Sequence, residues 1–157
     1  MSNARLNQAL APVLELLSTM DSAEAGAAAT LNDRFPVDGP EMTEIASLFA
    51  EGVEAGWLCD RKGSDTVMFS RIHKATDGEL SIDAVRMTGK GPGHTHPNGE
   101  FDLCFAVDGA PSFDGHRPGW VVYGPDSWHE PTVEGGTMNI LYVLPAGAIE
   151  FGPAPGK

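Results

Sequence analysis

The sequence predicts a mainly β fold, a sandwich or small barrel of the jelly-roll kind, with an N-terminal helical layer. Three observations support this class. The chain has 157 residues, enough for one domain with a sizeable core. Its 19 glycines and 12 prolines are concentrated after residue 37, which favours short strands joined by tight turns. The first third instead carries apolar residues at helical spacing.

Two helices are expected in that first third. Residues 4–19 carry an apolar stripe, which Pro12 interrupts or restarts. The alanine-rich run 21–30 is a loop or a short helical extension. A second helix begins after residues 38–41 and ends at Gly56, with Ile45, Leu48 and Phe49 on its buried face. The apolar faces of both helices must cover the outside of the barrel or a second subunit.

From residue 66 the pattern changes to strands. The candidates are 67–72, 80–87, 93–96, 100–107, 120–123 and 138–144. Turn residues separate them, including Asp77-Gly78, Pro97-Asn98-Gly99, Asp108-Gly109, Asp114-Gly115 and Gly135-Gly136. We therefore expect a helical segment over residues 1–60 that packs on a β-barrel over residues 61–157, in one structural domain overall.

Charge and cysteine content limit the function. The 10 basic residues are scattered among 22 acidic ones, which argues against nucleic acid as a partner. An anionic substrate would need a locally placed arginine. The two cysteines form no CxxC pair, and no signal segment opens the chain. Because no apolar run approaches the roughly 20 residues that cross a bilayer, we expect a cytoplasmic protein without membrane contact.

Three of the five histidines and one glutamate predict a metal site. His94 and His96 project from the same face of an extended segment, and the turn 97–99 brings Glu100 back toward them. His129 would complete the site from a later strand. Such nitrogen and oxygen ligands suit one divalent transition metal, with iron, manganese, zinc and nickel as candidates. The alternative is that these residues are polar side chains of a surface turn and a strand end.

At these residues the chain resembles the cupin superfamily. The first cupin motif is a glycine-rich approach, His-x-His, a spaced glutamate and a later glycine, and it is matched by 89–93, His94, His96, Glu100 and Gly109. The second motif is matched loosely by Pro125, Ser127 and His129. The resemblance implies a small jelly-roll-like barrel. A cupin that keeps the ligands but only binds a small molecule is the non-enzymatic alternative.

A narrower resemblance covers most of the chain. Several segments look like the bacterial 4-hydroxylaminobenzoate lyases: 31–36, 56–58, 94–102, 127–133 and 144–151. That family implies conversion of 4-hydroxylaminobenzoate to 3,4-dihydroxybenzoate with release of ammonia, in nitroaromatic degradation. It implies a small aromatic substrate, and we expect a homodimer. The alternative enzyme is a metal-dependent dioxygenase that acts on a small aromatic or thiol substrate.

Roles follow for the residues around the metal motif. Glu100 and His96 are the expected catalytic residues, with Glu100 a ligand or a proton shuttle. Arg86 or Arg71 could clamp a substrate carboxylate, and strand parity alone does not choose between them. Tyr123 and Trp128 could wall an aromatic ring, although core packing explains them equally. Asp102 shares the parity of Glu100 and could orient an imidazole, or lie in water at a strand end.

Overall fold

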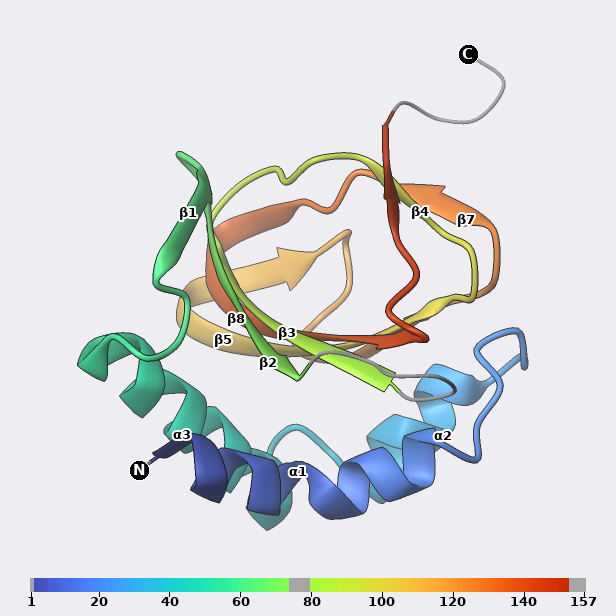
Figure 1. The fold of residues 1–157 in the computed structure, drawn as a ribbon, viewed down its shortest axis with the longest axis horizontal. Coiled ribbons are helices and arrows are strands. Elements are labelled where there is room, and N and C mark those ends of the chain that lie inside the picture. The colour runs from blue at the N-terminus through green and yellow to red at the C-terminus, as the bar shows by residue number, and fades with distance from the viewer. Residues whose placement is uncertain (1, 74–79, 153–157) are drawn as a thin grey trace.

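The structure is a computed structural model, which describes residues 2–73 and 80–152. Helices come first along the chain and strands follow (Figure 1). The helices are α1 (Ser2–Leu17), α2 (Ala27–Arg34) and α3 (Pro40–Ala55). The predicted class, mainly β with an N-terminal helical layer, is confirmed.

The strands form two antiparallel sheets. The larger has six strands in the order β1-β2-β3-β8-β5-β6, and the smaller has three in the order β7-β4-β9. The bounds are β1 (Arg61–Ser64), β2 (Val67–His73), β3 (Leu80–Met87), β4 (His94–His96), β5 (Glu100–Phe113), β6 (Gly119–Tyr123), β7 (Ser127–His129), β8 (Val133–Pro145) and β9 (Glu150–Phe151).

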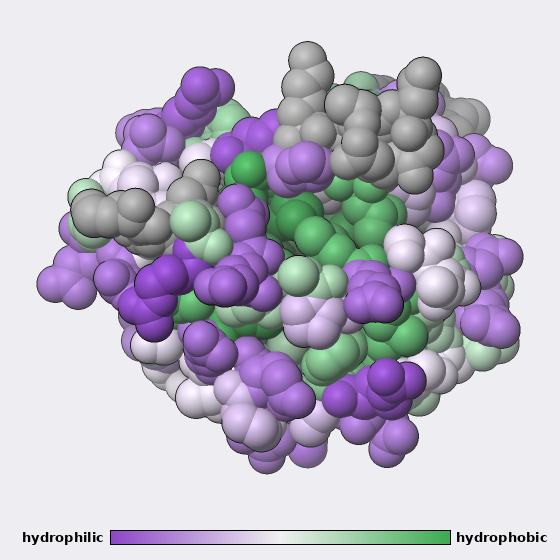
Figure 2. Space-filling view, turned by 60° about the horizontal axis from the view of Figure 1, so that its bottom comes forward, coloured by the Kyte–Doolittle hydropathy of each residue, from purple (hydrophilic) through white to green (hydrophobic). Residues whose placement is uncertain are grey.

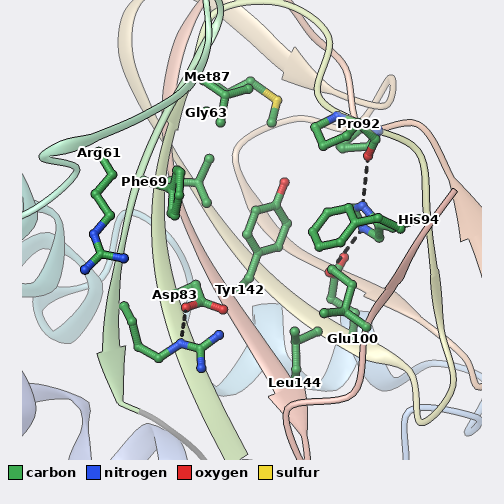
Figure 3. A pocket seen from close by; sticks show the side chains of 16 residues that line it. Arg61, Gly63, Phe69, Asp83, Met87, Pro92, His94, Glu100, Tyr142 and Leu144 are labelled. Atoms are coloured by element: carbon green, nitrogen blue, oxygen red, sulfur yellow. Dashed lines mark hydrogen bonds and ion pairs between the residues drawn. The ribbon is translucent and has the colours of Figure 1, made fainter.

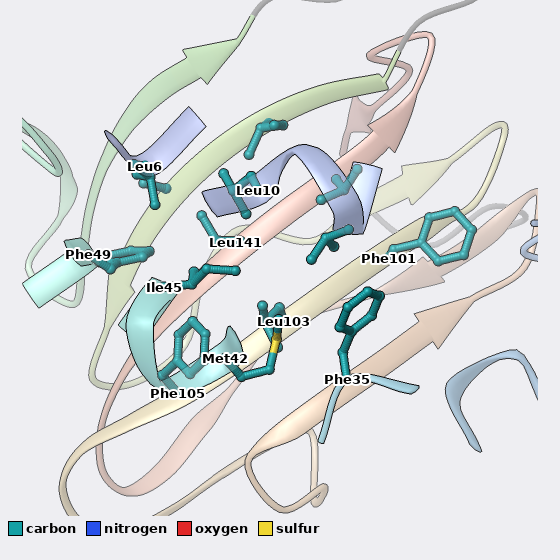
Figure 4. Packing of buried hydrophobic residues seen from close by; sticks show 14 of the residues in the cluster. Leu6, Leu10, Phe35, Met42, Ile45, Phe49, Phe101, Leu103, Phe105 and Leu141 are labelled. Carbon is teal, nitrogen blue, oxygen red and sulfur yellow. The ribbon is translucent and has the colours of Figure 1, made fainter. Parts of the chain in front are cut away.

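The helices cover one face of the six-stranded sheet (Figures 1 and 4). Side chains from α1 and α3, such as Leu6 and Phe49, pack there against Phe101 and Leu103 of β5 and Leu141 of β8. All five are at most 1 % exposed. Because successive strand residues point to opposite faces, the residues between these positions face the other way. The second face of the sheet is therefore available to the smaller sheet.

Two turns expected from the sequence are wrong. Asp108-Gly109 and Gly135-Gly136 lie within the long β5 and β8 ladder, where Gly109 pairs with Gly136 and the register shifts on both sides. A Cβ on Gly136 would lie 2.2 Å from the carbonyl oxygen of Asp108. These glycines therefore allow two bulged strands to approach closely, rather than ending them.

Other local differences have simple causes. Helix α1 runs through Pro12, because Pro12 and Gln8 are exposed and water can satisfy the carbonyl that loses its helical partner. Strands β1, β7 and β9 were not predicted, since they have two to four residues and show no alternating pattern. The expected turn at Asp77-Gly78 lies outside the described residues.

Figure 2 turns the helical side of the molecule toward the viewer. Hydrophilic residues cover most of this side, and hydrophobic residues gather near its middle. Within residues 2–73 and 80–152, no helix is long and apolar enough to cross a membrane. The homodimer stays a prediction.

Candidate metal centre and ligand cavity

The pairing of two short strands brings the three histidines together. Strands β4 and β7 are antiparallel, with His94 opposite His129 and His96 opposite Ser127. Residues directly opposite each other present their side chains on the same face, as do residues two apart in one strand. All three imidazoles therefore point from one face of the small sheet, and Trp128, opposite Thr95, points from the other.

A tight turn carries the chain from His96 to Glu100 on the six-stranded sheet. Gly99 has a φ of 86° and donates its N–H to the carbonyl of His96. A side chain there would also meet Ser22 and the carbonyl of Tyr123. Gly99 is thus required both for its left-handed backbone and for the close approach. The turn places the ligands of β4 and the carboxylate of β5 face to face.

The four side chains form a compact buried cluster. One ligand atom from each of His94, His96, Glu100 and His129 lies within 4.8 Å of the others. The glutamate oxygens are 3.7 Å from His94 Nε2, 3.2 Å from His96 Nδ1 and 3.4 Å from His129 Nε2. All of these atoms are buried, and none has a hydrogen-bond partner in the part of the chain that the structure describes. Buried polar atoms are normally satisfied, so this donor set fits a divalent metal ion.

Hydrogen bonds behind the cluster select the nitrogens that face it. Nδ1 of His94 is 3.0 Å from the carbonyl of Pro92, and Nδ1 of His129 is 2.7 Å from Oδ2 of Asp114. An imidazole that donates from Nδ1 keeps the lone pair on Nε2. In both residues Nε2 is therefore the nitrogen directed at the cluster.

Asp114 is a positioning residue that the sequence did not reveal. Its Oδ2 also accepts from the hydroxyl of Tyr123 at 2.5 Å, and its Oδ1 accepts from the N–H of Thr132 at 2.8 Å. These bonds and that from His129 outweigh burial and lower the pKa of Asp114 below its usual value. Asp102, which the sequence left either to orient an imidazole or to lie in water at a strand end, does neither: it is wholly buried and accepts no hydrogen bond from an imidazole of the described residues.

The buried groups divide into charged and neutral ones. Burial raises the pKa of Glu100, but the close approach of Asp102, His129 and His94 outweighs it and holds the value at about 2. Burial and the charge of Glu100 raise the pKa of Asp102 well above its usual value. Burial lowers the pKa of His96 to about 4. At neutral pH Glu100 is thus ionised and His96 neutral, and burial beside Glu100 favours the protonated form of Asp102.

A cavity of about 490 Å³ opens from the cluster between the two sheets (Figure 3). His94 and Glu100 lie on one side of it and Arg61 on the other, and Arg71 also lines it. Most of the remaining lining is apolar: Val67, Phe69, Val85, Met87, Pro92, Pro131, Leu144, Ile149 and Phe151. Such a space suits a small, largely apolar molecule with polar ends.

Of the four residues expected to contact a substrate, only Arg71 lines the cavity. Arg71 lines the cavity, whereas Arg86 shares the parity of Ala84, which packs beneath the helices on the other face. Tyr123 does not line the cavity either; it stacks on His129 with ring centroids 4.1 Å apart. Trp128 donates its indole N–H to the carbonyl of Gly152. The cavity instead contains Arg61 and Tyr142, which no sequence pattern had distinguished.

Comparison with known proteins extends the resemblance seen in the sequence. Residues 10–151 match the family model described as PnbB, 4-hydroxylaminobenzoate lyase. The chain belongs to this family. Two of its relatives are named 4-hydroxylaminobenzoate lyase. One, from Nocardioides sp. (strain LMS-CY), is 31 % identical, with 80 % of each chain covered. The other, from Pseudomonas putida, is 26 % identical, with 83 % of this chain and 85 % of the relative covered.

Solved structures similar to this family member include an RmlC-like cupin protein from Ralstonia eutropha JMP134. It is 15 % identical and has a TM-score of 0.44, with 60 % of this chain and 72 % of that chain covered. The two antiparallel sheets, with the His-x-His strand facing Glu100 between them, are the arrangement expected of a cupin, which confirms the predicted fold.

Replacing Asp114 tests its role behind His129. In Asp114→Asn a neutral amide replaces the charged carboxylate that accepts the hydrogen bond from Nδ1 of His129. The imidazole of His129 therefore loses its fixed orientation. We expect the affinity for zinc to fall by about 10- to 100-fold, measured by competition with a chelator of known affinity. Asp108→Asn is the matched control, because Asp108 lies at an exposed bulge away from the cluster. Equal zinc affinity in Asp114→Asn and the wild type would contradict this role.

Metal uptake should depend on pH through His129. Burial lowers the pKa of His129, but Asp114 and Glu100 outweigh it and raise the value to about 9. The metal-free protein therefore carries a proton on His129 at pH 7, and a metal ion must displace it. We expect affinity to rise with pH up to about 9. Calorimetric zinc titrations in two buffers of different protonation enthalpy should show release of about one proton at pH 7, and none would contradict this.

Proposed function

We propose that the protein is a metal-dependent lyase that converts 4-hydroxylaminobenzoate and one water into 3,4-dihydroxybenzoate and ammonia. This balance needs no external oxidant or reductant. The observation that carries the proposal is a single cavity that joins a buried three-histidine, one-glutamate cluster to two arginines, in a member of this family. The cluster can act on one end of an aromatic acid while an arginine holds the other.

The metal would be held by the four residues of the cluster. Their buried, unpartnered nitrogen and oxygen atoms are ligands that iron, manganese, zinc and nickel all accept. When bound, such an ion supplies Lewis-acid chemistry for loss of the N–OH oxygen and for delivery of a hydroxide. Asp114 fixes one ligand from behind, so the cluster is held in place before a substrate arrives.

Arg71 is the residue that we assign to the substrate carboxylate. Its Nε donates to Oδ1 of Asp83 at 2.8 Å, which fixes the direction of the guanidinium (Figure 3). A guanidinium has five N–H donors, so its terminal amino groups can still bind a carboxylate in bidentate fashion. Phe69 and Leu144 provide apolar wall for the aromatic ring. The ring would then lie between Arg71 and the histidines.

Glu100 and His96 are the residues that we assign to the chemistry. Glu100 is ionised at neutral pH and wholly buried, so it either binds the metal directly or accepts a proton from the reacting group. His96 is neutral and has no hydrogen-bond partner at either ring nitrogen, so a lone pair is available at the cluster. Both side chains are wholly buried, which keeps bulk water from them.

Anaerobic turnover is the decisive assay. We expect metal-loaded protein to convert 4-hydroxylaminobenzoate to equal amounts of ammonia and 3,4-dihydroxybenzoate. Chromatography measures both products over time. His96→Ala should lose activity by about 100-fold or more, because a ligand is removed. His116→Ala is the control, since His116 lies in an exposed hairpin turn.

The same assay separates the alternatives. Turnover that requires oxygen would contradict the lyase and favour a dioxygenase. Binding of the substrate without any product, with metal present, would favour a small-molecule-binding cupin. Full turnover after the metal has been stripped and verified absent would contradict the metal dependence.

Two arginine variants test the carboxylate contact. Arg71→Lys keeps the charge but loses the planar fork, so we expect KM for 4-hydroxylaminobenzoate to rise about tenfold, with a smaller change in kcat. Arg86→Lys makes the same chemical change on the helix-covered face and should leave KM within about twofold. Steady-state kinetics of both variants measure this. The reverse order of effects would assign the carboxylate to Arg86 instead.

A further inference from the structure

Tyr142 places a buried hydroxyl group in the cavity that has no hydrogen-bond partner among residues 2–73 and 80–152. The residue is 9 % exposed and lines the cavity, and its hydroxyl oxygen is buried and has no hydrogen bond. In Figure 3 the ring stands between Phe69 and His94, and the hydroxyl points away from Asp83, toward Met87 and Pro92. The metal cluster and the Arg71–Asp83 pair use other atoms.

The surroundings of this hydroxyl leave a ligand as its natural partner. A buried hydroxyl without a hydrogen bond is unfavourable, and native structures rarely retain one without a reason. The cavity residues around the ring include Phe69, Val85 and Met87, none of which has a strong acceptor. Packing alone would be served equally well by phenylalanine, which has no hydroxyl to satisfy.

The position of the hydroxyl indicates which part of a ligand it would contact. Asp83, which pairs with Arg71, lies on one side of the ring, and His94 and Glu100 lie on the other (Figure 3). We propose that the Tyr142 hydroxyl donates a hydrogen bond to the polar substituent of an aromatic acid, at the end of the ring opposite the carboxylate. This inference rests on the proposed function, because it assumes that Arg71 holds the carboxylate.

The tyrosine is suited to donate rather than to ionise. Burial raises the pKa of Tyr142 well above its usual value, and the nearby carboxylates of Asp102 and Glu100 raise it further. The hydroxyl therefore keeps its proton and offers it to a lone pair on oxygen or nitrogen. The contact would distinguish acids with a polar group para to the carboxylate from acids that have only a hydrogen there.

A pair of ligands that differ by one group tests the proposal. Calorimetry on zinc-loaded protein would compare 4-hydroxybenzoate with benzoate, in the wild type and in Tyr142→Phe. We expect the variant to bind 4-hydroxybenzoate about three- to tenfold more weakly, the effect of one hydrogen bond. Benzoate should bind within about twofold of the wild type. The melting temperature of the ligand-free variant should equal or exceed that of the wild type, since no hydrogen bond is lost in the protein itself.

Tyr123→Phe is the matched control. It removes the other phenol of the chain, which contacts Asp114 rather than the cavity. The ratio of the two ligand affinities should therefore not change in Tyr123→Phe.

Three results would overturn the proposal. An unchanged affinity ratio in Tyr142→Phe, with both ligands still bound, would overturn this contact alone. Equal weakening of both ligands together with a lower melting temperature would show a structural role for the hydroxyl. A wild-type protein that binds neither acid would overturn the proposed aromatic acid substrate, and the contact with it.

Discussion

The buried carboxylate of Glu100 is the constraint on which the site depends. A charge that is wholly removed from water is costly unless other groups compensate for it, and here three imidazoles surround it. Two of them come from β4 and one from β7, so the compensation requires both strands to pair in their observed register. The fold and the cluster are therefore specified by the same contacts. A bound metal ion would compensate further for the charge of the carboxylate.

Strand β5 joins this site to the hydrophobic core. Glu100 lines the cavity and Asp102 shares its face of the strand, while Phe101 and Leu103 point the other way and pack beneath the helices. A slip of one residue would exchange the two sets, placing carboxylates under the helices and phenylalanine at the cluster. The helical layer thus fixes the register of β5, and through it the position of the Glu100 carboxylate, although none of the described helical residues lines the cavity.

Basic side chains meet at the cavity although the chain as a whole is acidic. The chain has 22 acidic and 10 basic residues, so its overall field repels anions. Within the cavity, however, Arg61 and Arg71 approach the same space, and Asp83 orients Arg71. At physiological salt, long-range repulsion is screened over about 8 Å, whereas a bidentate contact at hydrogen-bond distance is not. Recognition of a carboxylate can therefore be local in an acidic protein.

The sequence by itself determined the fold class, the position of the helices before the strands, and the four residues of the cluster. His94, His96 and Glu100 lie within seven consecutive positions, and their geometry depends on strand alternation and one glycine turn, which are local. The tertiary structure alone decided that Asp114 supports His129, that Arg71 and not Arg86 lines the cavity, and that Tyr142 stands at its centre. These facts depend on which face of each strand is buried, and on bulges between strands far apart in the chain. Alternation assigns residues to two faces, but only packing against the helices and the second sheet decides which face encloses the cavity.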